Sequence, residues 1–361
     1  MRQLEADAPS LAAFDRLCQA SCGPVGIAVS GGSDSLALLY LAHEWANLNQ
    51  RDLIALTFDH RLRSASAGEA AQVAAISRDL GVDHDTLHWD QPVGRQSVAR
   101  RARHAALAQA VKAEGGSLLL TGHTADDQAE TFLMRARQGS TWYGLAGMQP
   151  VSLSPVWPEG EGVRIARPLL EERRTDLRSI LRNKGAKWVE DPTNDNPAYE
   201  RVRMRQMLAA SPSLFDRVSR CQADLAILRA IEDVRLGCWL RDHVRVSGTG
   251  GLDVALGPLG LESAARGMGL LIQFVAGRET PPRRDNLHSL ADRLLSGRAF
   301  AGATLGGAMV RRKGEIVHLE PEPSLDRPDP LLIARLGKES FLCDAAPMLE
   351  VNNTSKLKVL I

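Results

Sequence analysis

The sequence lacks any apolar run long enough to cross a bilayer. The longest such stretch near the N-terminus, Leu36 to Ala42, is far shorter than the roughly 20 residues that a transmembrane helix needs. The first residues also lack the basic start and apolar core of a signal peptide. We therefore expect a cytoplasmic protein without a membrane partner.

Cysteine is scarce and shows no paired spacing. The five cysteines are an odd number, and no two of them form the CxxC pair that zinc and redox sites usually show. We expect reduced structural thiols, with Cys18 and Cys22 on one face of a helix. This pattern disfavours a metal or redox centre built on cysteine.

The Walker signature GK[ST] is also missing, which argues against a Walker-type NTPase. A different phosphate-binding pattern is present, because Gly26 to Leu39 reads as an apolar strand, a turn of small residues and an amphipathic helix. Gly31 and Gly32 let the backbone approach an anion, and the positive N-terminal end of the helix faces it. We interpret this loop as a phosphate cradle; a strand-to-helix turn without a ligand is the alternative.

The order of patterns predicts an α/β fold with a doubly wound parallel sheet. At 361 residues the chain exceeds one hydrophobic core, so two domains are expected. Helical patterns alternate with β-rich runs, and the loops after Val29, Phe58 and Thr121 should meet at the carboxyl edge of the sheet. The predicted strands are 25–29, 52–58, 84–88, 117–121 and 163–166, and the predicted helices between them are 36–49, 67–80, 96–113 and 126–137.

The pattern changes after the first two hundred residues to long helices, which predicts a second domain. Residues 215–245 form a long helical stretch, residues 285–295 another, and residues 299–319 a glycine-punctuated β pattern. We predict a catalytic domain over 1–208, a mainly helical domain over 209–322 that ends in a small β region, and a tail over 323–361 of unknown role.

Charge is balanced overall but not locally. The net charge is +1, yet Gly94 to Lys112 contains five basic and no acidic residues, and Arg283 to Lys313 contains seven basic against two acidic residues. Such runs can contact a polyanion or simply solvate a helix face. Charge alone therefore permits binding of nucleic acid without establishing it.

The loop SGGSDS (Ser30 to Ser35) resembles the PP-loop of the N-type ATP pyrophosphatases, whose fold is Rossmann-like. Further motifs follow in the order seen in the tRNA(Ile)-lysidine synthetases, and the resemblance is strongest from Gly26 to Leu208. These motifs are FDHRLRSAS (58–66), ARRARH (99–104), GHTADDQAET (122–131), GLAGM (144–148), RPLL (167–170) and EDPTN (190–194).

The resemblance implies a two-step ligation on the wobble cytidine of the isoleucine tRNA with a CAU anticodon. ATP adenylates the C2 oxygen of that base and releases pyrophosphate. The ε-amine of free L-lysine then attacks C2 and displaces AMP, which yields lysidine. ATP and Mg²⁺ are the implied cofactors, tRNA is the implied partner, and a homodimer is an open alternative to a monomer.

The resemblance also assigns roles to individual residues. Asp34 and Asp127 are oxygen donors suited to Mg²⁺. Arg103 and His123 would stabilise charge on the α-phosphate, and Glu130 would hold the lysine ammonium. The implied ATP-binding residues are Ser30, Gly31, Gly32, Ser33, Asp34, Ser35 and Asp59, and the implied tRNA-binding residues are Arg100, Arg201, Arg203, Arg205, Arg283 and Arg284.

Each assignment has a plainer alternative. The alternative for the two aspartates is a helix cap, for Glu130 a solvent-exposed helix residue, and for Asp59 the cap of a turn. The arginines are equally compatible with solvated helix surfaces. His123 alone after a strand would be structural, but its register with Gly122 and Asp127 favours a functional role.

Three positions depart from the family pattern. Thr124 stands where a second histidine is common, Arg61 replaces a usual glycine, and Gln138 stands where an arginine is frequent. None of these removes a proposed catalytic group. The rival functions are another PP-loop ligase, such as a tRNA thiolase or a small-molecule amide synthetase, and a catalytically silent tRNA-binding protein. Thiolases usually need paired cysteines near the site, and none lies between Cys22 and Cys221.

Overall fold

The computed structural model describes residues 8–19, 21–61, 66–89, 96–156, 159–190, 196–247, 251–276, 278 and 281–323. The chain divides into two compact units, residues 1–227 and residues 228–361. The division falls inside the long helix α9 (Pro212–His243). The predicted tail over 323–361 lies outside the described residues except for Pro323, and so do residues 191–194 of the EDPTN motif.

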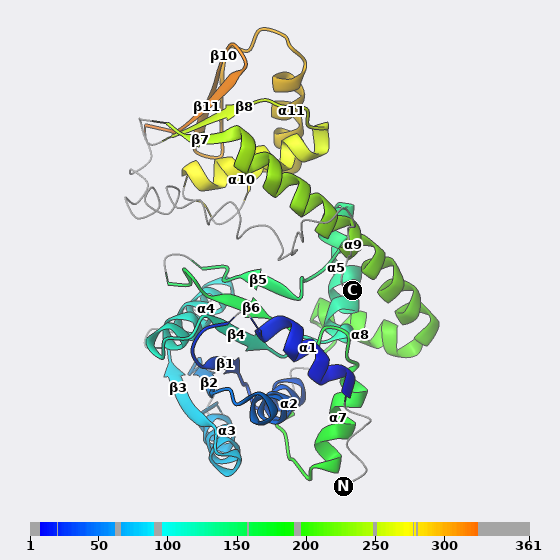
Figure 1. Ribbon diagram of the computed structural model, residues 1–361. Coiled ribbons are helices and arrows are strands. Elements are labelled where there is room, and N and C mark those ends of the chain that lie inside the picture. The colour runs from blue at the N-terminus through cyan, green and yellow to red at the C-terminus, as the bar shows by residue number, and fades with distance from the viewer. Residues whose placement is uncertain are drawn as a thin grey trace, which may run out of the picture. The chain divides into compact units, whose positions relative to one another are not determined.

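A six-stranded sheet forms the centre of the first unit (Figure 1). Its order is β3-β2-β1-β4-β6-β5, in which β5 alone runs antiparallel, along one edge. The strands are β1 (Val25–Ala28), β2 (Leu53–Asp59), β3 (Asp83–His88), β4 (Leu118–Thr121), β5 (Val151–Leu153) and β6 (Arg164–Ala166). Because β1 pairs with both β2 and β4, the loops that follow these three strands leave the sheet side by side.

Alternate residues of the parallel strands face two different cores. Leu118 and Leu120 of β4 point into a core with α2, whereas Leu119 points into a core that contains Leu107 and Val111 of α4. Period-two alternation of buried apolar residues is what a sheet covered on both faces requires. The helices of this unit are α1 (Ala8–Cys18), α2 (Ser33–Asn49), α3 (Ser66–Leu80), α4 (Gln96–Ala113), α5 (Ala125–Arg137), α6 (Trp142–Leu145), α7 (Arg174–Asn183) and α8 (Glu200–Ala210).

The sequence patterns locate this unit well. All five predicted strands and the four predicted helices between them are present, with ends that shift by a few residues. The doubly wound parallel sheet is therefore confirmed. The sequence patterns do not identify the edge strand β5 or the helices α6 and α7, which are short and lie outside the strand-helix alternation.

The prediction that Cys18 and Cys22 share a helix face is wrong. Helix α1 ends at Cys18, and Cys22 lies beyond it in a loop. Cys18 is fully buried, and burial raises the pKa of its thiol to about 12, whereas Cys22 is exposed. Both are free thiols with different environments.

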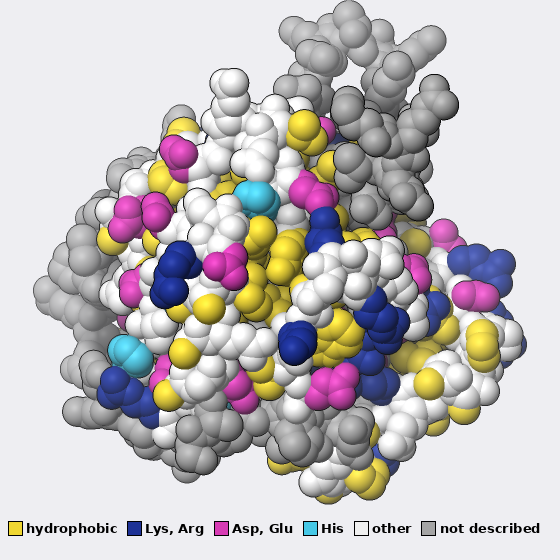
Figure 2. Space-filling view, turned by 90° about the horizontal axis from the view of Figure 1, so that it is seen from below, with side chains coloured by type: hydrophobic (Ala, Val, Ile, Leu, Met, Phe, Trp, Pro, Cys, Tyr) yellow, Lys and Arg dark blue, Asp and Glu magenta, His cyan; other side chains and the backbone are white. Residues whose placement is uncertain are grey.

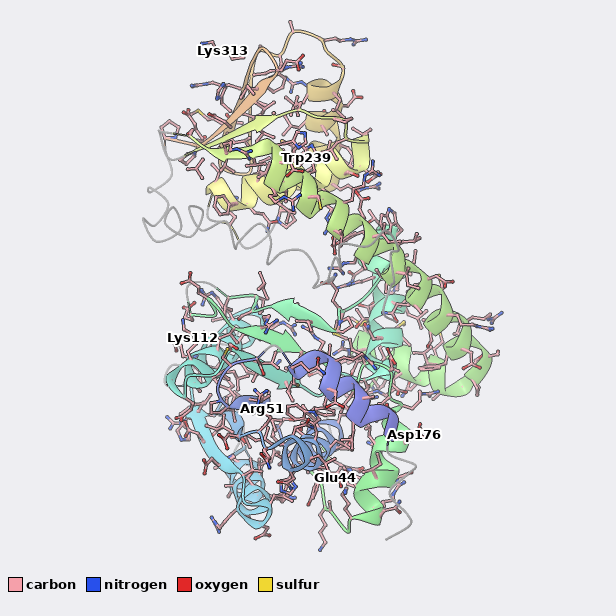
Figure 3. All side chains as sticks on the ribbon, in the orientation of Figure 1. Glu44, Arg51, Lys112, Asp176, Trp239 and Lys313 are labelled. Carbon is pink, nitrogen blue, oxygen red and sulfur yellow. The ribbon has the colours of Figure 1, made fainter. Side chains whose placement is uncertain are left out.

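The second unit combines helices with an antiparallel sheet. Strand order is β7-β8-β11-β10-β9, and helices α10 (Leu261–Ala276) and α11 (Arg284–Leu295) pack with α9 in one apolar core. Trp239 of α9, labelled in Figure 3, is buried in that core and stacks on His243. The strands are β7 (Val244–Val246), β8 (Leu252–Ala255), β9 (Ala303–Leu305), β10 (Ala308–Lys313) and β11 (Ile316–Pro321).

The predicted helices over 215–245 and 285–295 and the predicted β region over 299–319 are confirmed in this unit. The sequence patterns miss α10 and the two strands that precede it, β7 and β8. Within the described ranges, no helix has both the length and the apolar character needed to cross a membrane.

Surface charge does not mark a site by itself. On the face shown in Figure 2, Lys and Arg side chains alternate with Asp and Glu side chains, and hydrophobic side chains line a hollow between them. This mixture agrees with the near-neutral net charge of the chain.

Candidate active site

Hydrogen bonds of its own serines fix the conformation of the loop between β1 and α2. Ser35 Oγ accepts a hydrogen bond from the Ser30 N–H at 3.1 Å and donates one to the Gly32 carbonyl at 3.0 Å. Gly31 has a φ of 86°, in the left-handed region that side chains disfavour. The loop therefore curls around the N-terminus of α2, where unpaired helix N–H groups favour an anion.

The loop after β4 approaches the same place closely. A Cβ atom on Gly122 would lie 3.0 Å from the backbone oxygen of Asp34 and 3.1 Å from the Cα of Ser35. A side chain at Gly122 would thus force the two backbones apart. This contact brings the first turn of α5 beside the first turn of α2, as the parallel sheet predicts.

Asp34 and Asp127 each use one carboxylate oxygen locally. Asp34 Oδ1 accepts the Ser33 hydroxyl at 2.9 Å, and Asp127 Oδ2 accepts the backbone N–H of Thr124 at 3.0 Å. Thr124 and Asp127 form a capping box, in which the Thr124 hydroxyl accepts the Asp127 N–H at 3.3 Å. The cap interpretation of Asp127 is thus satisfied, but by one of its two oxygens.

The second oxygen of each aspartate contacts one guanidinium. Arg174 Nε lies 2.9 Å from Asp34 Oδ2, and Arg174 Nη2 lies 3.2 Å from Asp127 Oδ1. Burial alone would lower the pKa of Arg174, but the neighbouring carboxylates outweigh it and raise the pKa above its ordinary value. A single cation therefore bridges the two aspartates.

The position of Arg174 is fixed by the start of α7. Asp126 Oδ2 accepts the backbone N–H of Arg174 at 2.8 Å and also lies 3.4 Å from Arg173 Nε. Figure 3 labels Asp176 in the same helical turn. Asp126 on α5 thus ties the first turn of α7 to the loop after β4.

Glu130 lies one turn further along α5 and is 1% exposed. Three guanidiniums surround its carboxylate: Arg205 Nε at 2.8 Å, Arg174 Nη1 at 3.3 Å and Arg201 Nε at 3.3 Å. The interpretation of Glu130 as a solvent-exposed helix residue is therefore wrong. Guanidiniums of α7 and α8 thus pair with its charge, while Oε2 has no hydrogen-bond partner among the described residues.

Basic side chains gather on the opposite flank of the loop after β4. Burial lowers the pKa of His123 to about 4, and the positive charge of Arg167 adds to that effect. Arg103 and Arg100 act on His123 in the same direction, while Asp127 opposes them. His123 is therefore a neutral imidazole near pH 7, with Nδ1 3.0 Å from the Thr121 hydroxyl oxygen.

His104 belongs to the same basic cluster and is buried. Burial lowers its pKa to about 4, helped by the charges of Arg103 and Arg100. Within the part of the chain that the structure describes, neither of its ring nitrogens has a hydrogen-bond partner. The cluster therefore combines an excess of positive charge with neutral imidazoles, which suits an anionic ligand.

Asp59 ends β2 and is nearly buried. Its Oδ1 accepts the N–H of Arg61 at 2.8 Å. Burial opposes the charge of Asp59, yet hydrogen bonds from the Ser66 hydroxyl and the Arg61 N–H hold its pKa below the usual value. Arg61 has a φ of 52°, which explains why glycine is usual at this position.

Comparison with known proteins identifies the family. Residues 11–211 match the family model described as PP-loop domain. The tRNA(Ile)-lysidine synthase of Hyphomonas neptunium is 51% identical over 90% of this chain and 93% of its own length. Those of Ruegeria pomeroyi and Caulobacter vibrioides are 37% and 39% identical, over 80% and 83% of this chain and 69% and 67% of their own lengths.

The chain belongs to the tRNA(Ile)-lysidine synthase family. Residues that the family motifs singled out converge around the loop after β4: Asp34 and Asp127 share a cation, and Arg103 lies close enough to His123 to act on its charge. The resemblance stated from the motifs is confirmed.

The predicted tRNA-binding arginines are in varied surroundings. Arg201 and Arg205 are paired with Glu130, and Arg203 donates to the Pro197 carbonyl at 2.7 Å. Arg283 and Arg284 belong to the second unit, where Arg284 pairs with Glu262 at 2.8 Å. Arg100 is exposed beside the basic cluster.

Sequence reasoning gave no role to Arg174, His104 and Arg167 of this candidate site. Arg174 follows the RPLL motif closely, and the adjacent basic pair Arg173 and Arg174 was the available signal. His104 was quoted as the last residue of the ARRARH motif but received no role. Nothing in the sequence shows that its side chain is buried next to His123.

Proposed function

We propose that this chain forms lysidine on the CAU-anticodon isoleucine tRNA. ATP adenylates the C2 oxygen of the wobble cytidine with release of pyrophosphate, and the ε-amine of lysine then displaces AMP from C2. The observation that carries the proposal is the near-full-length similarity to the lysidine synthase of Hyphomonas neptunium. The geometry supports it, because adenylation needs a phosphate-binding loop beside acidic and basic groups.

In this proposal the loop from Ser30 to Ser35 binds the ATP phosphates through backbone N–H groups and hydroxyls. The left-handed Gly31 and the N-terminus of α2 supply the anion-binding surface. Asp59, at the end of the neighbouring strand β2, is charged and close to the same edge, and it binds the adenosine part.

Asp34 and Asp127 are the residues that would hold Mg²⁺. Their donor set fits, because the carboxylate oxygens that make no local hydrogen bond, Asp34 Oδ2 and Asp127 Oδ1, both contact the Arg174 guanidinium. Among the described side chains, no three His, Cys, Asp or Glu residues gather to hold a metal by themselves. Two carboxylates with phosphate oxygens are the usual Mg²⁺ environment, and the ion would offset charge on those phosphates.

Arg103 and His123 are proposed to stabilise charge that builds on the α-phosphate. His123 is neutral before ATP binds, so its contribution at that stage is a hydrogen bond and not a charge. A phosphate next to it favours protonation, since an opposite charge favours the charged form of a group. Arg103 supplies a permanent positive charge.

Glu130 is proposed to hold the lysine ammonium. Its carboxylate is paired with Arg174, Arg201 and Arg205, so an ammonium has to take the place of at least one guanidinium. Arg201 is the partner with the most exposed side chain, at 48%. Its release to the tRNA backbone would open Glu130 Oε2 to lysine, which would link tRNA binding to lysine binding.

The exposed arginines are proposed to contact tRNA phosphates, which carry most of the affinity for nucleic acid. Arg100 serves the anticodon next to the site. Arg201, Arg203 and Arg205 lie on α8, and Arg283 with Arg284 begins α11 in the second unit. The enzyme acts in the cytoplasm.

Mass spectrometry of nucleosides tests the function. The protein is incubated with ATP, Mg²⁺, lysine and an isoleucine tRNA transcript that carries the CAU anticodon, and the digest is searched for lysidine. Without lysine, adenylated tRNA and pyrophosphate should form and lysidine should not. Pyrophosphate release without lysidine when lysine is present would overturn the proposed reaction.

A further inference from the structure

Arg174 makes three contacts that the established motifs do not predict. Its three guanidinium nitrogens face three different carboxylates, with Nε on Asp34, Nη2 on Asp127 and Nη1 on Glu130. The side chain is 14% exposed, and the two aspartates are also largely shielded. A cation thus occupies the place between two loops where the proposed metal ligands meet.

The oxygens that Arg174 contacts are the ones that a metal would need. Asp34 Oδ1 is engaged by the Ser33 hydroxyl, and Asp127 Oδ2 is engaged by Thr124. The remaining oxygens, Asp34 Oδ2 and Asp127 Oδ1, both lie on Arg174. A guanidinium and a divalent cation cannot share these two oxygens, because like charges at such short range repel strongly.

We infer that Arg174 is a further positioning and phosphate-binding residue of this site. Before ATP binds, its guanidinium bridges Asp34 and Asp127 and keeps the two loops together. When ATP binds, the guanidinium leaves these aspartates and binds a phosphate oxygen, and the two carboxylates would then be able to hold a divalent cation. The inference rests on the proposed use of ATP and Mg²⁺.

The surroundings of Arg174 favour such a movement of the side chain. Its backbone N–H is held by Asp126, so the start of α7 stays in place while the side chain moves. Glu130 contacts the guanidinium from the side away from Asp34, and it offers a partner that remains after the aspartates are released. One turn later, Arg178 Nε lies 3.4 Å from the Ser33 hydroxyl, so α7 faces the phosphate-binding loop.

The inference predicts that a divalent cation and ATP bind together. In the unliganded protein the two aspartate oxygens are already neutralised, so free metal gains little there. With ATP present, the exchange brings a phosphate to the guanidinium and a metal to the aspartates, and each charge finds an opposite partner. Binding of metal without nucleotide should therefore be weak.

Binding of Mn²⁺ without nucleotide tests whether Arg174 occupies the two aspartates before ATP binds. Electron paramagnetic resonance measures free Mn²⁺ in titrations of wild type, Arg174→Gln and the control Arg173→Gln. Arg173 has the same residue type one position earlier, but it contacts Asp126 and the Phe215 ring. We expect Arg174→Gln to bind Mn²⁺ at least ~10-fold more tightly than wild type and the control. Equal affinity in all three proteins would overturn the inference.

Binding of ATP tests whether the Arg174 guanidinium then binds a phosphate oxygen. With saturating Mg²⁺, isothermal titration should show ATP bound ~10-fold or more weakly by Arg174→Gln, since a charge-assisted contact to phosphate is lost. Arg174→Lys keeps a positive charge, so its affinity for ATP should lie between those of wild type and Arg174→Gln. Unchanged ATP affinity in Arg174→Gln would overturn the phosphate contact.

Folding of the variant can be followed in the same samples. Arg174→Gln leaves carboxylates without their cation, so its unfolding temperature should drop and should recover when Mn²⁺ is added. Wild type should show little change with Mn²⁺ alone. A drop that Mn²⁺ does not reverse would assign Arg174 a purely structural role and overturn the inference. None of these measurements needs tRNA or lysine, so their failure is distinct from failure of lysidine formation.

Discussion

The two flanks of the loop after β4 differ in charge: one carries carboxylates and the other carries arginines and histidines. On the acidic flank, Asp34, Asp127 and Glu130 are each paired with guanidiniums, and Arg174 reaches all three. On the basic flank, burial lowers the pKa of His104 and His123, and the positive charges of Arg100, Arg103 and Arg167 lower it further.

The comparison teaches where a ligand is needed. On the acidic flank each carboxylate already has a guanidinium partner, so a cationic ligand has to displace one. The basic flank carries positive charge that an anion would neutralise, and its buried imidazole His104 has no hydrogen-bond partner within the described residues. ATP and a tRNA backbone are the kinds of anion that would complete it.

Removing an acidic charge while keeping its shape should give the largest effect. Asp34→Asn and Asp127→Asn should each lower the rate of pyrophosphate release by about a hundredfold to a thousandfold, because each removes a proposed metal ligand. Asparagine can preserve the contacts to Ser33 and Thr124, so the fold should persist. Asp126→Asn is the matched control, because Asp126 contacts the Arg173 side chain and the Arg174 backbone N–H but not the Arg174 guanidinium. Near wild-type release by either variant would show that the metal assignment is wrong.

Glu130→Gln should affect both stability and the second step. The amide still fits but leaves three guanidiniums without their charge partner, so the free energy of unfolding should fall by about 3 kcal/mol in urea titrations. Lysidine formation should fall more than pyrophosphate release, so adenylated tRNA should accumulate. Glu200→Gln, which breaks the exposed pair with Arg137, should change stability by less than about 1 kcal/mol. Equal loss of both chemical steps would remove Glu130 from lysine binding.

The basic flank should make stability depend on pH. In the unfolded chain His104 takes up a proton near pH 6.5, whereas burial and Arg103 lower its pKa to about 4 in the folded protein. The unfolded state therefore binds more protons between these values, and stability falls as the pH is lowered from 6.5 towards 4. The expected slope is up to about 1.4 kcal/mol per pH unit.

His104→Gln should flatten this dependence, because glutamine does not titrate. Urea unfolding of wild type and variant at pH 7 and pH 5 measures the difference. His123→Gln should flatten it as well, since the pKa of His123 is also lowered to about 4. An identical loss in wild type and His104→Gln would show that His104 is not held neutral by the fold.

Arg61 should give the smallest effect. Glycine at this position removes both a positive charge and the strain of a left-handed φ of 52°, so Arg61→Gly should raise the free energy of unfolding by up to about 1 kcal/mol. Arg61→Ala removes the charge and keeps the strain, so it separates the two causes. A gain of equal size in both variants would attribute the change to charge.

Much of the fold follows from local pattern. Most strands and helices around the sheet were predictable from their apolar residues, and the motif Ser30 to Ser35 lies at the junction of one such strand and helix. The edge strand β5 and the helices α7 and α10 were not found, since their residues do not continue the strand-helix alternation. Tertiary packing determines such elements more than local propensity does.

The sequence by itself determined the family, the position of the PP-loop motif and the residue types that meet at the carboxyl edge of the sheet. Local spacing suffices for these, because motif residues follow strand ends and parallel strands place their ends together. Only the tertiary structure decided that Arg174, far along the chain from Asp34, bridges it to Asp127, and that His104 is buried beside His123. Charge pairing and desolvation depend on distances between segments that are remote in sequence, and no local pattern contains those distances.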